Sequence, residues 1–393
     1  MILCQKIYYK KGEQGIIIVA YDGASTLIIP DNIKGIPVTE IAENAFSEEN
    51  IKHTNHLEEI IYSEQQYCFI EWQEDIKIEK TNALQKVILP NSIQKIGKSA
   101  FSYCSALTQI DLPKYIKIIP ERCFSHCIGL KEIKIPESVT DIQKYAFHDC
   151  IKLERIYLPN SIFVLGDYVF YNNYCLYEIV LPENILVGMG AFKNCKNLKK
   201  VMLQGNTAFL DVFADLEQEV EMHIINMPKE QKGCTEVKLF FPDFEYEYME
   251  NYPARQFKQM NYGSGYLYHQ CIHNSGIDFT RYDNLFSMAK REETKYIALE
   301  IAFNRLQYPY KLRKKNEMEY MAFLKQNILF AVKSYLQEIE KLYFLSKLNG
   351  IFTSENIDNI IDIAIQQKNV QAISFLTDYK MKHFGITKKS FDL

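Results

Sequence analysis

The chain has 393 residues, of which 47% are hydrophobic and 24% are charged, and its formal net charge is −4 at pH 7. These values are those of an average soluble globular protein, so they argue against a disordered chain and against a basic, nucleic-acid-binding protein. No window contains the roughly 20 consecutive apolar residues that a membrane-spanning helix needs, so we expect no membrane insertion.

The N-terminal residues do not have the pattern of a secretory signal peptide. In residues 1–11 the charges follow the apolar residues, and there is no long apolar region and no small-residue cleavage site. Ten Cys in a chain of this length are too few for a disulfide scaffold. The sequence therefore favours a cytoplasmic protein with reduced thiols. The alternative is a cell-surface or secreted protein whose leader has been removed.

A 23-residue repeat dominates the middle of the chain. Its unit reads L-x-x-I-x-L-P, then x-x-I-x-x-I, then A-F-x-x-C. The prolines mark the period most clearly, at Pro90, Pro113, Pro136, Pro159 and Pro182. Because proline has no N–H donor, each one predicts the end of a short strand. One unit is too small to bury its own apolar face, so the repeat predicts a parallel-stranded solenoid with columns of Leu, Ile and Phe inside.

One repeat position is cysteine in most units and asparagine in one. Its members are Cys104, Cys127, Cys150, Asn173 and Cys195. We interpret them as small buried core residues, because a column spreads its side chains along the axis whereas a metal needs ligands that converge. Cys123, His126 and Cys127 lie close together in the sequence, but Cys123 takes the Ala position of the A-F signature, so core packing is favoured there too.

The signatures I-x-L-P and A-F-x-x-C make residues 107–201 resemble the BspA-like leucine-rich repeats. The resemblance extends over about residues 16–205, since Thr26-Leu27-Ile28-Ile29-Pro30 and Ala45-Phe46 look like an opening coil. It breaks between Ile51 and Thr81, where we expect an irregular or bulged coil. The resemblance implies an interaction scaffold, often on bacterial surfaces, with no shared active site.

Two columns of side chains are expected to point outward from the strands, because successive residues of a strand alternate between its faces. The first is Lys86, Gln109, Glu132, Arg155, Glu178 and Lys200. We interpret it as a ladder of cross-strand ion pairs, and partner binding through Glu132 and Arg155 is the alternative.

The second outward column is more apolar than an exposed strand face needs to be. It consists of Ile88, Asp111, Lys134, Tyr157, Val180 and Met202. Its consecutive members Tyr157, Val180 and Met202 form a candidate protein-binding patch. Contact with the following domain is the alternative interpretation.

The composition changes after Gly205. Asn206–Tyr252 contains 11 acidic and 3 basic residues, a net charge of −8. We expect residues 206–280 to be an acidic capping or linking region with short strands, in which the aromatic and acidic run at 241–248 covers the open end of the solenoid.

His269, Cys271 and His273 alternate within this region. On an extended strand they would share one face, which gives a secondary hypothesis of a metal site. A metal-dependent or enzymatic module around residues 246–286 therefore remains an alternative function.

Residues 281–393 are expected to be helical. Apolar pairs such as Ile297-Ala298 and Ile301-Ala302 recur at helical spacing, and further helices are predicted over 318–345 and 357–367, the last with Ser354 as its N-cap. Ile363–Leu376 resembles the helix-turn-helix core of an ankyrin repeat, with Lys368 at the place of the turn glycine.

The sequence thus predicts an α+β protein in three parts: a leucine-rich-repeat β-solenoid at 1–205, the acidic region at 206–280 and an α-helical domain at 281–393. We expect a non-catalytic protein-interaction scaffold that uses the exposed strand face and the helical array, without a cofactor. The alternatives are the metal-dependent or enzymatic module around residues 246–286 and cell-surface adhesion. The candidate partner-binding residues of the scaffold are Tyr157, Val180, Met202, Arg155 and Glu132.

Overall fold

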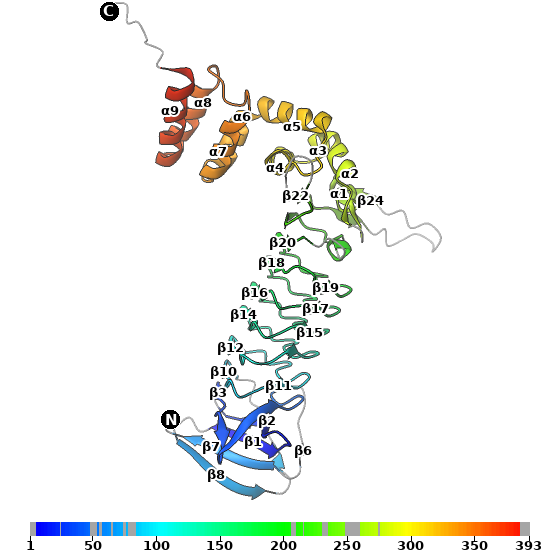
Figure 1. Cartoon of the computed structure of the whole chain (residues 1–393), viewed down its shortest axis with the longest axis vertical. Coiled ribbons are helices and arrows are strands. Elements are labelled where there is room, and N and C mark those ends of the chain that lie inside the picture. The colour runs from blue at the N-terminus through cyan, green and yellow to red at the C-terminus, as the bar shows by residue number, and fades with distance from the viewer. Residues whose placement is uncertain are drawn as a thin grey trace, which may run out of the picture. The chain divides into compact units, whose positions relative to one another are not determined.

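The computed structural model describes residues 5–23, 25–47, 53–54, 57–63, 66–73, 76–77, 84–205, 210–214, 216–229, 235–247, 260–273 and 276–385. The chain divides into two compact units (Figure 1). The first comprises Met1–Pro228 and Phe241–Asp278, and the second comprises Lys229–Phe240 and Phe279–Leu393. The acidic region expected at 206–280 therefore belongs partly to one unit and partly to the other.

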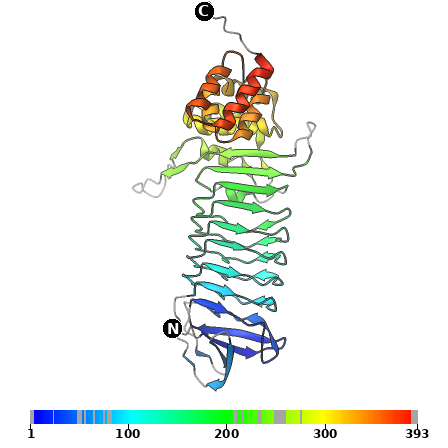
Figure 2. The same ribbon diagram turned by 90° about the vertical axis from the view of Figure 1, so that its left-hand side faces the viewer.

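The first unit is a solenoid whose coils carry a ladder of short parallel strands (Figure 2). The strands are β3 (Thr26–Ile28), β10 (Lys86–Ile88), β12 (Gln109–Asp111), β14 (Glu132–Lys134), β16 (Arg155–Tyr157), β18 (Glu178–Leu181), β20 (Lys200–Gln204) and β21 (Val220–Ile225). The register follows the repeat, since Val87 pairs with Ile110 and Ile133 pairs with Ile156. Each proline of the repeat follows the end of its strand by one or two residues, as predicted.

A second row of parallel strands runs along another side of the coils. It comprises β5 (Ile36–Ile41), β11 (Lys95–Ile96), β13 (Ile118–Ile119), β15 (Asp141–Ile142), β17 (Val164–Leu165) and β19 (Leu186–Val187). Gly166 directly follows β17, and a Cβ atom there would lie only 2.4 Å from the backbone nitrogen of Lys144 in the previous coil. Glycine therefore permits the close approach of neighbouring coils at this position.

The core between the two rows consists of residues stacked in columns. Phe46, Phe101, Phe124, Phe147, Phe170, Phe192 and Phe213 form one column, with neighbouring ring centroids 5.0 to 5.8 Å apart. The cysteine column is also buried, as predicted. Each of its thiols donates a hydrogen bond to a phenylalanine carbonyl of the previous coil; the Sγ of Cys127, for example, lies 3.1 Å from the carbonyl oxygen of Phe101.

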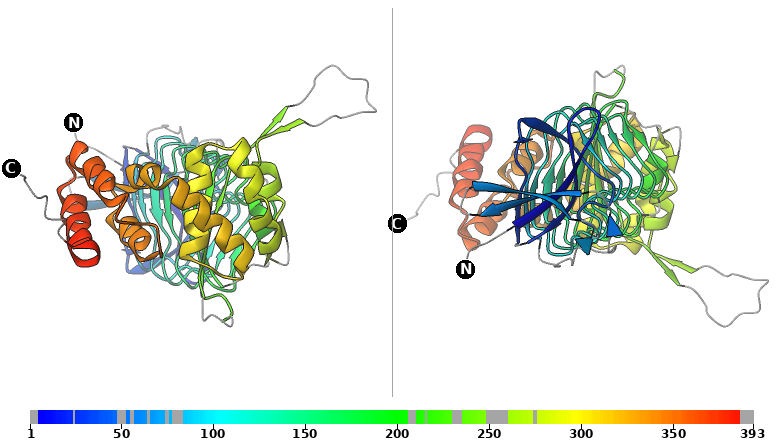
Figure 3. Two further views of the ribbon diagram at one scale, coloured as in Figure 1. Left: turned by 90° about the horizontal axis from the view of Figure 1, so that it is seen from above. Right: turned by 90° about the horizontal axis from the view of Figure 1, so that it is seen from below.

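Antiparallel strands precede and interrupt the solenoid at its N-terminal end (Figure 3). They are β1 (Gln5–Lys11), β2 (Ile16–Asp22), β4 (Asn32–Ile33), β6 (His53–Thr54), β7 (Leu57–Ser63), β8 (Gln66–Gln73) and β9 (Ile76–Lys77). The bulged coil expected within 51–81 is wrong, because β7 pairs antiparallel with β1 and with β8. The opening coil at 26–46 is confirmed, and β3 pairs directly with β10 across this insertion.

The C-terminal end of the solenoid has one more coil than the repeat predicted. The 3₁₀ helix η1 (Leu210–Phe213) places Phe213 on the phenylalanine column, 5.0 Å from Phe192, and β21 pairs in parallel with β20. Phe192 and Phe213 are 21 residues apart rather than 23, which is why this coil lay outside the predicted frame.

Short elements follow in the same unit. They are β23 (Glu245–Glu247), β24 (Met260–Tyr262), α1 (Gly265–His269), β25 (Ile272–His273) and β26 (Gly276–Ile277). Phe241 and Phe244 are buried, and the backbone N–H of Phe244 donates to the carbonyl of Glu217. Phe244, within the acidic segment, is thus tied to the last coil.

The second unit consists of helices and of β22 (Val237–Phe241) up to Phe240. The helices are α2 (Phe279–Asn284), α3 (Phe286–Glu292), α4 (Lys295–Gln307), α5 (Lys314–Gln326), α6 (Ile328–Tyr335), α7 (Ile339–Lys347), α8 (Ile357–Gln366) and α9 (Val370–Phe384). The predicted helical domain is confirmed. Among the described residues, no helix has both the length and the apolar character needed to cross a membrane.

A buried ion pair joins three helices of this unit. The Nε and Nη2 atoms of Arg305 in α4 lie 2.7 and 3.0 Å from the carboxylate oxygens of Asp283 in α2. The hydroxyl of Tyr320 in α5 donates to the same carboxylate at 2.9 Å. Arg305 is fully buried, and its Nη2 also donates to the carbonyl of Tyr310.

Helices α8 and α9 form the pair that resembles an ankyrin helix-turn-helix. Lys368 between them has φ of +55°, so the residue at the place of the turn glycine has the left-handed conformation that glycine favours. The predicted N-cap is wrong, because α8 begins after Asn356 rather than Ser354. The Oδ1 atom of Asn356 accepts from the backbone N–H of Thr353, which closes the preceding turn.

Candidate functional site: the exposed strand face of the solenoid

The outward side chains of the parallel ladder define a strand face, formed by β10, β12, β14, β16, β18 and β20 (Figure 2). Tyr157, Val180 and Met202 are exposed on it by 50%, 40% and 39% of their accessible surfaces. Val180 and Met202 are direct partners in the strand register, and Tyr157 lies on the adjacent strand β16. The three residues are therefore neighbours and form one apolar patch, which we call the apolar patch of the strand face.

Charged residues lie beside this patch on the same face. Glu132 pairs in register with Arg155, and Glu178 pairs with Lys200. Although these residues are exposed and opposite in charge, no ion pair joins them within residues 84–205, all of which the structure describes. The interpretation as a ladder of ion pairs is therefore wrong. Long side chains in water gain little from such pairing, and the cation of Lys200 lies instead over the ring of Tyr177.

Cross-coil ion pairs are found on another side of the solenoid. Glu121 contacts Lys98 of the previous coil at 3.4 Å and Lys144 of the next coil at 3.5 Å. Burial by itself would raise the pKa of Glu121, but hydrogen bonds and charge attraction from Lys98 and Lys144 outweigh it, so the pKa is lowered. Direct ion pairing thus links coils at Glu121 rather than at the predicted column.

A groove of about 790 Å³ lies on the strand face beside the apolar patch. It is lined by residues of β12 and β14, including Asp111, Glu132 and Lys134, and by Tyr157. The backbone ladder is interrupted here, because β12 and β14 belong to separate sheets. Tyr157 is therefore shared between the charged groove and the apolar patch.

A second group of exposed apolar residues was not predicted. Phe163, Leu186 and Met189 are exposed by 53%, 56% and 66% on the side of the solenoid that carries β17 and β19. The backbone N–H of Leu186 donates to the carbonyl of Phe163, so these two residues belong to neighbouring coils. The repeat could have indicated this group, because the apolar residue Phe163 takes the position that the polar residues Lys117 and Thr140 hold in earlier coils.

The secondary metal hypothesis at His269, Cys271 and His273 rested on a strand that does not form. His269 ends helix α1 and is buried, Cys271 lies in the following turn, and His273 is exposed in β25. The Nε2 atom of His269 lies 3.1 Å from the carbonyl oxygen of Pro242, between Phe241 and Phe244. Burial lowers the pKa of His269 from 6.5 to about 4. His269 therefore packs inside the end of the solenoid. The prediction that His269, Cys271 and His273 share one face of a strand is wrong.

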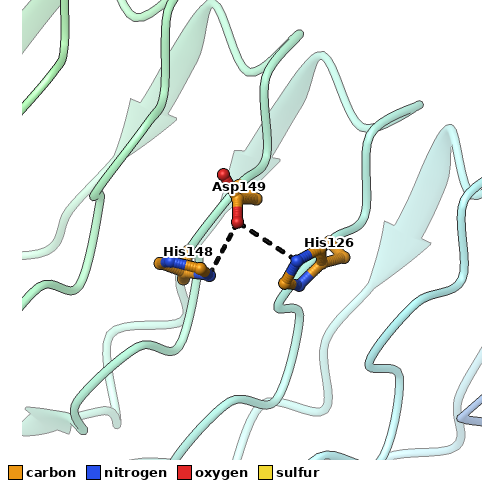
Figure 4. Close-up of side chains that lie close together, drawn as sticks. All are labelled: His126, His148 and Asp149. Carbon is orange, nitrogen blue, oxygen red and sulfur yellow. Dashed lines mark ion pairs between the residues drawn. The ribbon is translucent and has the colours of Figure 1, made fainter. Parts of the chain in front are cut away.

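A different group of metal-ligand residues does converge. Among the described residues, His126, His148 and Asp149 offer three ligand atoms that all lie within 4.8 Å of one another (Figure 4). All three side chains are half-buried on the corner of two neighbouring coils. This cluster was not predicted, because along the chain His126 lies near Cys123 and Cys127. The available signal was the repeat itself, since residues 126 and 149 are 23 positions apart and so occupy equivalent places in adjacent coils.

Comparison with known proteins identifies the repeat. Residues 78–199 match the family described as BspA type leucine rich repeat region, in 6 copies. A comparison with curated proteins finds no match.

Similar solved structures are leucine-rich repeat proteins. One from T. pallidum is 28% identical, with a TM-score of 0.31, over 53% of this chain and 76% of its own. A leucine rich cell surface protein of Faecalibacterium prausnitzii A2-165 is 20% identical, with a TM-score of 0.37, over 62% of this chain and 57% of its own. A leucine-rich repeat protein of Bacteroides ovatus ATCC 8483 is 19% identical, with a TM-score of 0.31, over 57% of this chain and 70% of its own.

Proposed function

We propose that this chain, whose solenoid is a BspA-type leucine-rich repeat region, is a non-catalytic scaffold that binds another protein through its strand face. Leucine-rich repeat proteins typically serve in protein interaction or at surfaces. The observation that carries the proposal is the apolar patch of the strand face. Tyr157, Val180 and Met202 are neighbours on successive strands and are all substantially exposed.

The surroundings of the patch suit a protein partner. Interfaces have an apolar centre in which aromatic residues and methionine are enriched, with a polar rim around it. Tyr157 and Met202 supply such a centre, and Glu132 and Arg155 lie on the same face with their charges not paired to each other. We expect a partner that buries Tyr157 and places charged groups of both signs opposite Glu132 and Arg155.

The helical unit is proposed as a second interaction module. Between its helices α8 and α9, Lys368 has the left-handed conformation at the place where an ankyrin repeat has its turn glycine. Stacked helical pairs present extended surfaces rather than closed pockets, which suits binding of another protein.

We also propose that the chain works in a reducing compartment, the cytoplasm. The thiols of Cys104, Cys127, Cys150 and Cys195 are buried in the solenoid core and donate to backbone carbonyls, as reduced cysteines do. Localisation of the tagged chain in its own cells tests this; detection at the cell surface would contradict it.

Binding is tested by comparing two matched triple variants. The first is Tyr157→Ser, Val180→Thr and Met202→Gln on the strand face. The control is Phe163→Ser, Leu186→Thr and Met189→Gln, which removes equally exposed apolar groups from the other side. Partners captured by the wild-type chain are purified and their affinity for each variant is measured.

We expect the strand-face variant to bind at least tenfold more weakly, because buried aromatic anchors carry most of the energy of an interface. The control variant should bind like the wild type, and both should keep its thermal stability. Loss of binding only in the control would overturn the proposal in favour of the opposite side.

A further inference from the structure

The corner that carries His126, His148 and Asp149 is built by the repeat. His126 and Asp149 precede the buried cysteines of their coils and have φ of +61° and +57°. The same corner position holds Asn172 and Asn194 in the next two coils, also in the left-handed region. The backbone N–H of His126 donates to the carbonyl of His148 at 2.8 Å, so two adjacent coils hold the three residues together.

Two of the three distances between the ligand atoms are close to the spacing that a metal needs, and the third is at most 4.8 Å. The Nε2 atom of His126 and the Nδ1 atom of His148 lie 3.1 and 3.0 Å from the same oxygen, Oδ2 of Asp149 (Figure 4). Two ligands of a tetrahedral zinc ion at 2.0–2.2 Å are about 3.3–3.6 Å apart. A movement of a few tenths of an ångström therefore opens both distances to the tetrahedral value.

We propose that His126, His148 and Asp149 bind one divalent ion of the zinc type, with a fourth coordination position open to water or to a group from a partner. Two imidazole nitrogens and one carboxylate oxygen are a donor set that suits zinc, and three protein ligands with an open fourth position occur in known zinc sites. The site goes beyond the proposed function, since it lies on the coil corner rather than on the strand face.

Further residues hold the ligands in orientation. The Oγ atom of Ser125 lies 2.9 Å from Nδ1 of His126, the ring nitrogen that faces away from Asp149. The Nδ2 atom of Asn172 donates to Oδ1 of Asp149 at 2.7 Å, which leaves Oδ2 directed to the histidines. Outer partners of this kind fix the orientation of metal ligands and tune their affinity.

Aromatic rings limit the rotation of both imidazoles. Tyr103 stacks on His126 with centroids 4.1 Å apart, and Tyr171 stacks on His148 at 5.3 Å. The side chains of His126, His148 and Asp149 remain 31%, 19% and 21% exposed, so an ion can reach them from solvent. The site is therefore both oriented and accessible.

The charges around the site permit a cation to bind. The neighbouring cation Arg122, which opposes metal binding, lies 2.9 Å from the carboxylate of Glu121. The carboxylate of Asp149 supplies the negative charge at the centre of the site.

The test uses the full chain with zinc alone, titrated against a chromophoric chelator that competes for the ion. The variant His126→Asn/Asp149→Asn removes two ligands while asparagine tolerates the left-handed backbone, as Asn172 and Asn194 show at the same corner. The control is His273→Asn, which removes an exposed histidine elsewhere. Thermal unfolding with and without zinc gives a second readout.

We expect one zinc equivalent in the wild type and in the control, and its loss in the double variant. Zinc should raise the unfolding temperature only where it binds, because it joins two coils. Asn172→Ala should weaken binding by about 10- to 100-fold, the usual effect of removing an outer partner. Cobalt bound in place of zinc should show no thiolate-to-metal charge-transfer band, which separates this site from the cysteines.

Two results would overturn the inference. One is no saturable zinc binding to the wild-type chain, which would leave Ser125, His126, His148, Asp149 and Asn172 as a hydrogen-bonded link between coils. The other is a zinc equivalent that survives in the double variant, or a cobalt spectrum dominated by thiolate, which would place the ion elsewhere.

Discussion

The two units bury their polar groups in different ways. In the solenoid, one arrangement is repeated, since the thiol of each cysteine in the column donates to a phenylalanine carbonyl of the coil before it. In the helical unit, a network of Arg305, Asp283 and Tyr320 joins α2, α4 and α5. Repetition spreads stability over equivalent contacts, whereas this charged arrangement in the helical core does not recur from one helix to the next.

The largest effect is expected from breaking the network of the helical unit. Arg305→Ala should lower the free energy of unfolding by about 3–5 kcal/mol, because it leaves the buried carboxylate of Asp283 without its cation. Hydrogen exchange followed by mass spectrometry should show lost protection in residues 279–385. Protection in residues 84–205 should be unchanged. Equal losses in both ranges would contradict the separation of the two cores.

Replacing both charged residues of this network by apolar residues separates the effect of charge from that of packing. Asp283→Leu combined with Arg305→Met removes both charges and should recover part of the stability lost in Arg305→Ala. Recovery should be incomplete, since the Tyr320 hydroxyl and the Tyr310 carbonyl lose their partners. A double variant no more stable than the single one would show that packing, rather than charge, dominates there.

A smaller effect is expected from His269, a buried titratable group at the end of the solenoid. Burial lowers its pKa from 6.5 to about 4, so between these values the unfolded chain binds a proton that the folded chain does not. Stability should therefore fall as the pH is lowered from 6.5 to 4, by up to about 3 kcal/mol. Urea unfolding over this pH range measures the loss.

The variant His269→Gln provides the control for that titration. Its amide can still donate to the carbonyl of Pro242 but carries no titrating group. Its stability should change less between pH 6.5 and 4 than that of the wild type. An identical pH dependence in the two proteins would assign the titration to other groups.

The smallest effect is expected from correcting the irregular member of the cysteine column. Asn173 is fully buried, and neither polar atom of its side chain has a hydrogen-bond partner in the part of the chain that the structure describes. Asn173→Cys should stabilise the chain by about 1–3 kcal/mol, because it replaces an unsatisfied amide by the residue of the equivalent positions. Thermal unfolding measures the gain. Destabilisation would mean that the asparagine makes a buried contact through water.

The strand ladder and the columns of core residues could be predicted from the sequence, because each coil repeats the same environment. The extra coil was missed since its spacing is 21 residues, and there Gln218 hydrogen-bonds the carbonyls of Cys195 and Leu198. The inserted strands β7 and β8 were missed because their pairing with β1 is a long-range choice that no local pattern specifies.

The repeat predicts whether the side chain of a site residue points into the core or outward, and no more. It correctly predicted that Tyr157, Val180 and Met202 are exposed, and their role in binding stays a prediction. It did not decide whether Glu132 and Arg155 touch, because register brings backbones together while exposed side chains remain free to point elsewhere. The cluster of His126, His148 and Asp149 could be predicted only by comparing equivalent positions in adjacent coils, since its members converge only in the folded chain.

The insertion between the first two coils also sets an order of assembly. Lys86 pairs with Thr26, 60 positions earlier, whereas Gln109 pairs with Lys86, 23 positions earlier. Closing the longer loop costs about 0.8 kcal/mol more in chain entropy, by the logarithmic dependence on loop length. We therefore expect the coils from residue 84 onward to form faster, and the N-terminal coil to pair with them after they have folded. During synthesis this coil is made before β10, the strand with which it pairs.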